Sequence, residues 1–211
     1  YIRDTKDMLT TSLTLPDVFG AKTPKANCAN LRTKGWEITL SWQDEFQLAG
    51  SPFSYNVSAS VGDYITKITK YHNPDRLISD HYVGKTLGEI WGYHVEGLFK
   101  TDREAAEYQA RIDDKAVNNR VYQCKGPAGN YLRAGDVRFA DLDGDNVISE
   151  GSGTVDDPGD KRIIGNSLPR YNYSFRVGFN WMGFDVSAFF QGIGRRDWYP
   201  AAGQASYDFW G

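Results

Sequence analysis

The feature that most constrains this chain is a long alternation of apolar and polar residues toward its C-terminal end. From Tyr171 to Trp181, aromatic or aliphatic residues occupy every second position, and polar or small residues stand between them. The alternation resumes from Phe184 to Gln191, after the dipeptide Met182-Gly183. Because successive side chains of a strand point to opposite faces, this period of two predicts a long antiparallel hairpin with one apolar and one polar face.

A second hairpin is predicted nearer the N-terminus. Residues 36–43 and 55–62 alternate in the same way, residues 49–52 supply the turn, and the second strand has room to continue to Ile68. Trp or Tyr stands at both ends of two apolar rows: Trp36 with Trp42, and Tyr171 with Trp181. Such placement is typical of the aromatic belts at the two interfaces of a membrane. The pattern alone leaves two architectures open, a transmembrane β-barrel and a soluble β-sandwich.

Composition excludes two other classes. The 211 residues carry a formal net charge of −3, without the basic excess that a nucleic-acid-binding surface needs. Mean hydropathy is −0.54, and the longest apolar runs fall far short of the roughly 20 residues of a membrane helix. Aromatic residues make up 14% of the chain and glycines number 22, which favours strands joined by tight turns.

The region between the hairpins has a different character. Residues 118–166 are rich in Gly, Asp and Pro. So long a segment is unusual inside a compact soluble domain, but it is ordinary on the extracellular side of an outer-membrane barrel. Residues 88–99 fit either a short strand or an extended loop. Thr101 and Glu104 form a capping box, which predicts one short helix over Asp102 to Asp113.

No pattern of catalytic residues is present. The three histidines lack metal-ligand spacing, no G-x-S-x-G elbow occurs, and the neighbouring acids Asp113-Asp114 and Asp156-Asp157 point apart rather than together. Trp91 and Tyr93 fit a sugar-stacking pair, although we favour a structural role for both. The two cysteines, Cys28 and Cys124, lie outside any CxxC motif, and whether they pair is left open. We therefore expect no enzymatic activity.

Six segments, in order along essentially the whole chain, resemble the SusC/RagA-type TonB-dependent transporters of Gram-negative outer membranes. They are Tyr1–Leu9 (similar to Y-x-R-x-T-K-D-x-L), Asn30–Glu37 (N-x-G-x-E), Ile90–Phe99 (Y-G-Y…G-I-F), Gly135–Asp145 (G-D-x-x-Y-x-D-x-N-G-D), Ile164–Tyr171 (I-G-N-x-x-P-x-F/Y) and Gly183–Gly192 (G-F-D-L-S-x-F-F-Q-G).

The resemblance implies an all-β fold, in which the antiparallel strands of a transmembrane barrel carry long extracellular loops and one short helix. Residues 1–211 would form a later part of a large barrel with a plugged lumen. Strand hairpins would span about 31–70 and 170–194, and an extracellular loop region about 72–168. The plug and the N-terminal domains are absent from this sequence.

The function implied by the resemblance is TonB-energised uptake of oligosaccharides or peptides across the outer membrane, with a SusD-like surface lipoprotein as partner. Its barrel would contact outer-membrane lipid, and TonB would act through parts that this sequence lacks. One alternative is a soluble calcium-binding β-sandwich that binds glycans. A second is an accessory domain of a secreted glycan hydrolase.

The acidic run from Asp141 to Asp145 predicts a calcium site. Asp141, Asp143 and Asp145 stand at positions one, three and five of an EF-hand-type loop, and Val147 would add its carbonyl at position seven. Asn146 replaces the usual glycine at position six, and Ser152 replaces the closing glutamate at position twelve. Compared with the family, residues 151–159 look like an insertion that moves the closing carboxylate to Asp160. The competing interpretation is an acidic turn without metal.

The barrel interpretation also predicts the orientation of side chains. Lipid-facing residues would be Trp36, Ile38, Leu40, Tyr55, Val57, Tyr173, Phe175, Val177, Phe184 and Val186. Lumen-facing residues would be Glu37, Asn56, Arg176 and Asp185. An isolated chain would expose this apolar face and unpaired strand edges, so we expect it not to fold as a soluble monomer.

Overall fold

The computed structural model describes residues 1–11, 25–114 and 132–199, and these form two compact units. The sheet unit comprises Tyr1–Lys70, Gly84–Gly88 and Asn166–Gly211, and the loop unit comprises Tyr71–Val83 and Glu89–Gly165. We describe each unit by itself. Among the described residues, no helix is long and apolar enough to cross a membrane.

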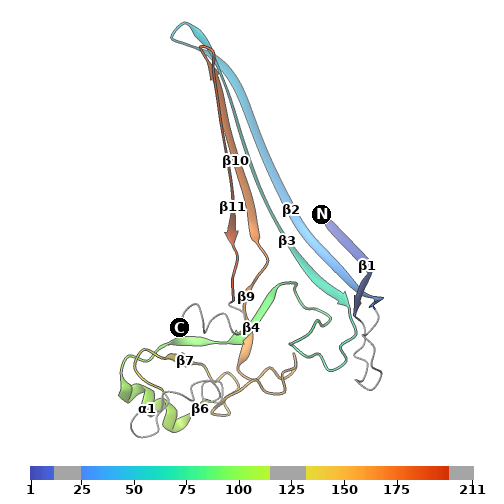
Figure 1. Ribbon diagram of the computed structural model, residues 1–211, viewed down its shortest axis with the longest axis vertical. Coiled ribbons are helices and arrows are strands. Elements are labelled where there is room, and N and C mark those ends of the chain that lie inside the picture. Colours follow the sequence, from blue (N-terminus) through green and yellow to red (C-terminus); the bar gives the residue numbers. More distant parts are fainter. Residues whose placement is uncertain (12–24, 115–131, 200–211) are drawn as a thin grey trace. The chain divides into compact units, whose positions relative to one another are not determined.

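The sheet unit is built on five antiparallel strands in the order β1-β2-β3-β10-β11 (Figure 1). Their bounds are β1 Ile2–Thr11, β2 Lys25–Leu48, β3 Ser51–Lys70, β10 Arg170–Trp181 and β11 Phe184–Arg195. β3 and β10 are neighbours in the sheet although the sequence of the loop unit lies between them. The loop unit is therefore one long excursion between two adjacent strands.

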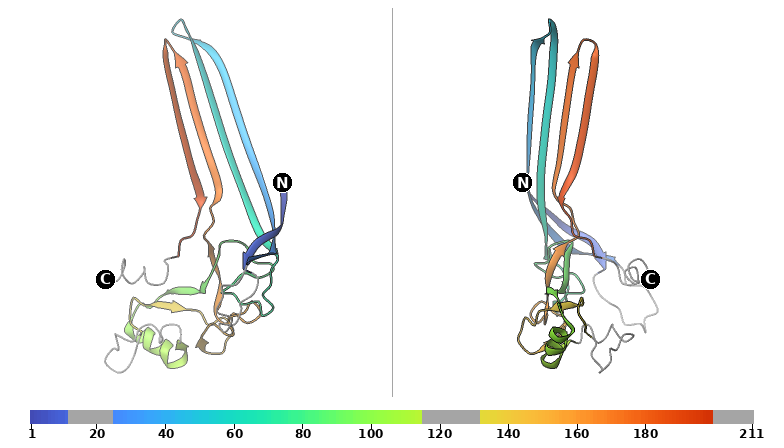
Figure 2. Two further views of the ribbon diagram at one scale, coloured as in Figure 1. Left: turned by 45° about the vertical axis from the view of Figure 1, so that its right-hand side comes forward. Right: turned by 90° about the vertical axis from the view of Figure 1, so that its left-hand side faces the viewer.

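Both hairpins close with two-residue turns at the same end of the sheet (Figure 2). Ala49 and Gly50 have φ of 51° and 78°, and Met182 and Gly183 have φ of 49° and 84°. Two successive positive φ values are the mark of a type I′ turn, whose twist matches that of the flanking strands. Glycine at the second position of each turn relieves part of the strain that Ala49 and Met182 accept.

One face of the sheet is apolar across four strands. Direct pairing joins Leu40 to Ala59, Trp42 to Val57, Val57 to Val177, and Val177 to Ala188. The same register places these further residues on this face: Ile38, Phe46, Phe53, Tyr55, Val61, Tyr173, Phe175, Phe179, Trp181, Phe184, Val186 and Phe190. Leu40 and Phe184 are 71% and 69% exposed, so within the sheet unit this face is left open.

Two polar residues lie on the apolar side of the sheet. Asp44 stands opposite Tyr55, between the apolar residues Trp42 and Phe46. Farther from the hairpin turns, Trp36 stands opposite Asp63, which is 6% exposed and forms an ion pair with Arg170. The guanidinium Nε of Arg170 donates to Asp63 Oδ1 at 2.6 Å. At Trp36, the first residue of the predicted apolar row, the residue on the neighbouring strand is therefore not apolar but belongs to a buried ion pair.

The opposite face of the sheet is polar. Its rows run across the strands as Thr39, Ser60, Ser174 and Gln191, and as Gln43, Asn56, Gly178 and Ser187. The hydroxyls of Ser60 and Ser174 are hydrogen-bonded to each other at 2.7 Å. Glu37, Asn56, Arg176 and Asp185 all lie on this face, opposite to the apolar residues, as the alternation predicted.

The N-terminal strand β1 was not predicted as a strand. It pairs with β2 from Ile2, opposite Lys34, to Thr11, opposite Lys25, with register shifts around Met8. Asp7 has φ of 54°, and its amide donates to Asn30 Oδ1 at 2.9 Å. This irregularity interrupts the alternation from which a strand would be recognised. β2 begins at Lys25, whereas the apolar row of the sequence indicated a strand only from Trp36 onward.

The loop unit has a small core of its own. Its described elements are β4 Glu89–Tyr93, β5 Val95–Leu98, α1 Asp102–Arg111, β6 Asp113–Asp114, β7 Val137–Phe139, β8 Val147–Ile148 and β9 Lys161–Asn166, the last of which ends in the sheet unit. The strands pair as β4-β9, β5-β7 and β6-β8. The core residues are Phe99, Ala105, Tyr108, Ile112, Leu132 and Ile148.

The predicted helix is confirmed, two residues shorter than expected. The hydroxyl of Thr101 accepts a hydrogen bond from the Glu104 amide at 3.1 Å, which is the N-cap contact of the capping box. The helix buries Ala105 and Tyr108 against the core and ends at Arg111.

The two faces of β10 predict opposite responses to the same substitution. The barrel interpretation places Val177 against lipid, where a charged side chain costs about 2–4 kcal/mol at the membrane midplane. On this interpretation we expect Val177→Arg to lower the yield of folded barrel in the full-length protein. Asn180→Arg, on the polar face beside Asp185, should leave assembly unchanged. The heat-dependent mobility shift of the barrel on gels measures the folded fraction. Equal yields for both variants would contradict the assignment of the faces.

Candidate functional site

The acidic turn between β7 and β8 brings three carboxylates together. One oxygen from each of Asp141, Asp143 and Asp145 lies within 4.8 Å of the other two. The loop is held by its own carboxylates: Asp141 accepts from the amides of Gly144 at 2.7 Å and Asn146 at 2.9 Å. Asn146 has φ of 63°, the left-handed conformation that its position in such a loop requires. Val147 begins β8, and Ile148 is fully buried beside it.

Asp160 fastens this turn from outside it. Its side chain is fully buried and accepts from the Leu142 amide at 2.6 Å and from the Ser149 amide at 2.8 Å. The Asp160 amide also donates to the Ser149 carbonyl at 3.0 Å. Asp160 therefore holds both ends of the acidic turn, and it stands outside the group of three converging carboxylates. Its predicted role as a metal ligand stays a prediction.

Charge repulsion inside the turn is visible at Asp143. A hydrogen bond from the Asp145 amide lowers the pKa of the Asp143 carboxyl, but this effect is outweighed by desolvation and by repulsion from Asp145, Asp160 and Asp141. The net result is a pKa for Asp143 above its usual value. A cation among these carboxylates would relieve the repulsion.

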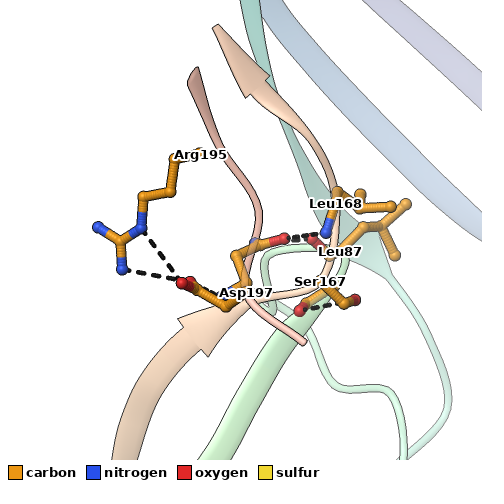
Figure 3. Close-up of polar contacts among 7 residues, drawn as sticks. Leu87, Ser167, Leu168, Arg195 and Asp197 are labelled. Atoms are coloured by element: carbon orange, nitrogen blue, oxygen red, sulfur yellow. Dashed lines mark hydrogen bonds and ion pairs between the residues drawn. The ribbon is translucent and has the colours of Figure 1, made fainter. Parts of the chain in front are cut away.

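A second polar site lies in the sheet unit, where the chain returns toward β10 (Figure 3). The side chain of Asn166 donates to the Leu87 carbonyl at 3.0 Å and accepts from the Leu168 amide at 2.8 Å. The Ser167 amide donates to the Gly88 carbonyl at 2.7 Å. Gly88 has φ of +82°, and a Cβ there would lie 2.5 Å from Asn166 Oδ1, so this position requires glycine.

Asp197, just after β11, forms hydrogen bonds with residues of the same site. Its carboxylate accepts from the Asn166 amide at 2.8 Å, and its own amide donates to the Asn166 carbonyl at 3.0 Å. Arg195 also contacts this carboxylate, at 3.2 Å (Figure 3). These hydrogen bonds lower the pKa of Asp197, the Asn166 amide contributing most. Three segments distant in sequence thus meet at Asn166, which gives the I-G-N motif a physical role that sequence reasoning did not identify.

The aromatic pair Trp91 and Tyr93 has structural contacts. Trp91 Nε1 donates to Glu89 Oε1 at 3.0 Å, and the Tyr82 hydroxyl donates to the same oxygen. Burial, together with the hydrogen bond to Glu89, raises the pKa of Tyr82 to about 12. The Tyr93 ring packs 5.5 Å from that of Phe139 at the edge of the core. This arrangement agrees with the structural role that we favoured over sugar stacking.

Four of the remaining candidates make contacts with different partners. His81 packs edge-on against Tyr71, and His94 contacts Arg162. Asp156 forms an ion pair with Arg76 at 2.6 Å, whereas Asp157 accepts from the Ser152 amide. Cys28 Sγ lies 3.8 Å from the Thr10 carbonyl, and Cys124 lies outside the described residues, so its pairing is untested.

The two hydrogen bonds of Asp160 predict a matched pair of variants. Asp160→Asn places an amide NH₂ among backbone donors in a buried position, and leaving one donor unsatisfied costs about 1–3 kcal/mol. We expect limited proteolysis of the full-length protein to cleave faster between residues 132 and 165. Asp157→Asn, an exposed carboxyl that also accepts a backbone amide, should change cleavage little. Equal rates in both variants would show that Asp160 does not fasten the turn.

Comparisons with known proteins bear on the fold and the family. No protein-family model matches the chain. A curated relative, TonB-dependent receptor P3 of Formosa agariphila, is 23% identical over 190 residues, which cover 84% of this chain and 16% of the relative. The chain therefore spans about a sixth of that relative's length.

The chain is similar to solved structures at low sequence identity. The RagAB peptide importer in its closed-closed state aligns with a TM-score of 0.51 and 16% identity, over 91% of this chain and 18% of the matched chain. A structure of the RagAB peptide transporter aligns with a TM-score of 0.49, over 90% of this chain and 18% of that chain.

The antiparallel sheet has the two-faced register of a barrel wall. The chain is thus similar to a TonB-dependent receptor over most of its own length, and its fold is that of a segment of the RagAB importer.

Proposed function

We propose that this chain forms part of the wall, and one long outer loop, of an importer in the outer membrane of a Gram-negative bacterium. The observation that carries the proposal is the register of β2, β3, β10 and β11, which collects apolar side chains on one face and polar side chains on the other. A wall between lipid and an aqueous lumen needs this division on every strand.

The turns and the excursion support an orientation in the membrane. Outer-membrane barrels have short turns on the periplasmic side and long loops outside the cell. Both described hairpins close with two-residue turns, whereas β3 and β10 are joined through the whole loop unit. We therefore assign the loop unit to the cell surface, where a SusD-like lipoprotein would be its partner.

The transport activity belongs to the complete protein. We propose uptake energised by TonB, with peptides as the first substrate class and oligosaccharides as the second. The order follows the solved relatives, which are described as a peptide transporter and a peptide importer. The proposed role is transport and involves no catalysis.

Deletion of the whole gene in the source bacterium tests the activity. We expect slower growth on a peptide mixture as sole nitrogen source, restored by the full-length gene only where TonB is present. Growth on free amino acids should not change, and this serves as the control. A defect confined to oligosaccharides would move the proposal to the second substrate class, whereas normal growth on both would reject import of either.

We also propose that calcium binds the acidic turn as a structural ion. The converging oxygens of Asp141, Asp143 and Asp145 support this, as does the raised pKa of Asp143. Oxygen ligands at 2.3–2.6 Å suit calcium. The carbonyl of Val147, water and an oxygen of Asp160 would complete the coordination.

The calcium proposal predicts that a chelator loosens the loop unit. We expect faster proteolysis between residues 132 and 165 after chelation, with calcium restoring protection and magnesium restoring less of it. Asp143→Asn combined with Asp145→Asn should give the same cleavage with and without calcium, while the hairpin of β10 and β11 stays intact. Asp156→Asn combined with Asp157→Asn is the matched control. Chelator-independent cleavage of the wild type would reduce the motif to an acidic turn.

A further inference from the structure

The apolar side of the sheet becomes basic beyond Trp36. The pairing of β2 with β3 continues from Trp36 to Arg32 without a register shift, so Lys34 and Arg32 lie on the same side as the apolar residues. Ile65 of β3 stands opposite Lys34, and Lys67 stands opposite Arg32. Three cations therefore occupy the two rows that follow Trp36, and we call Arg32, Lys34 and Lys67 the basic patch.

β1 adds one apolar and one acidic residue to these two rows. It lies beside β2 at the end far from the hairpin turns (Figure 1), with Ile2 opposite Lys34 and Asp4 opposite Arg32. Asp4 accepts two hydrogen bonds from Arg32, at 2.6 and 3.0 Å. Lys34 and Lys67 are both exposed, and neither pairs with a carboxylate among the residues that the structure describes. Two charges of the basic patch therefore have no counter-charge.

The height of the apolar band gives the level of the basic patch in the membrane. From Trp36 to Phe46, β2 rises about 33 Å. At a strand tilt of roughly 40°, this rise covers about 25 Å of the membrane normal, which is the height of the lipid-facing band of an outer-membrane barrel. Trp36 then lies at one membrane interface, where aromatic belts occur. The basic patch follows about 7 to 13 Å farther along the strands, at the level of the lipid headgroups.

The end of this side nearest the hairpin turns carries no such cations. From the row of Asp44 and Tyr55 to the turns, the other described residues of β2, β3, β10 and β11 on this side are all uncharged: Phe46, Leu48, Ser51, Phe53, Phe179, Trp181, Phe184 and Val186. The basic patch lies instead at the end where β3 leads into the loop unit. The orientation proposed above places that end at the outer leaflet.

We propose that the basic patch binds the phosphate groups of a glycolipid in the outer leaflet of the outer membrane. The inference rests on the proposed barrel and its orientation, and it adds a lipid site with named residues. Lys34 stands between Ile2 and Ile65, which are 66% and 38% exposed. A lysine whose stem lies along apolar neighbours and whose ammonium group reaches outward suits the boundary between acyl chains and phosphates.

Charge and position together favour this ligand. Phosphate complements the two lysines that have no carboxylate partner, and cations beside a membrane attract anionic headgroups. The basic patch is also continuous with the side of the sheet that the barrel turns toward lipid. A membrane lipid meets both conditions at once, whereas a soluble anion has no use for the apolar residues of the same rows.

Lipid binding by the full-length transporter in detergent tests the proposal. The probes are lipid A with both phosphates and the same lipid with both phosphates removed, and native mass spectrometry measures the bound fraction. We expect the phosphorylated form to bind more tightly. Lys34→Gln combined with Lys67→Gln should weaken its binding roughly 10- to 30-fold, whereas Lys34→Arg combined with Lys67→Arg should retain it. Equal affinity for both forms of the lipid, or no loss in the glutamine variant, would overturn the proposal.

Two cations on the polar face provide the matched control. Arg3 stands opposite Thr33, and Arg176 stands opposite Ser58. Arg3→Gln combined with Arg176→Gln removes the same charge and should leave lipid binding unchanged, so an equal loss in both double variants would reject a local site. Displacement of the lipid by millimolar inorganic phosphate would identify a site for a free anion instead. The growth test of import is independent, since impaired lipid binding and impaired import are measured separately.

Discussion

The register between strands is the constraint on which the rest of the structure depends. Because side chains alternate between faces, a slip of one residue between β3 and β10 would move Val177 to the polar face and Arg176 to the apolar face. The two type I′ turns fix the pairing within each hairpin, since both hairpins close over two residues. Between β3 and β10 no turn can do this, because the loop unit separates them in the chain.

Polar contacts at the start of β10 fix that pairing instead. The ion pair between Asp63 and Arg170 joins β3 to the first residue of β10. Asn166, just before it, binds both the segment that follows β3 and the segment that follows β11. Arg170 and Asn166 thus belong to one short stretch that sets where β10 enters the sheet. The I-G-N motif at the start of this stretch therefore helps to position β10, which explains why the sequence indicated no chemical role for it.

The sequence predicted the strands of the sheet unit better than it predicted those of the loop unit. The hairpins were predictable because lipid and water impose opposite demands on alternate residues, as Val177 and Asn180 illustrate. The helix was predictable because the capping contact between Thr101 and Glu104 is local. β1 could not be predicted from the sequence because its bulge at Asp7 breaks the alternation. The strand pairs β5-β7 and β6-β8 could not be predicted because these strands are too short to show any period. The converging carboxylates were expected from spacing, whereas the fastening role of Asp160 needed the fold, since Leu142 and Ser149 meet it only in space.

Because alternate residues meet different surroundings, the apolar residues on the polar face need an explanation. In the proposed barrel, an aromatic side chain on the lipid face, such as Phe190, is surrounded by lipid and needs no partner within the protein. Phe189, one residue along, faces the other way and has only Arg176 and the rim of a shallow hollow beside it. Had this face met only water, a polar residue at position 189 would have matched the rows of Ser, Asn and Gln around it. Phe189 and Ile193 thus interrupt the polar rows that the other residues of this face form on β10 and β11.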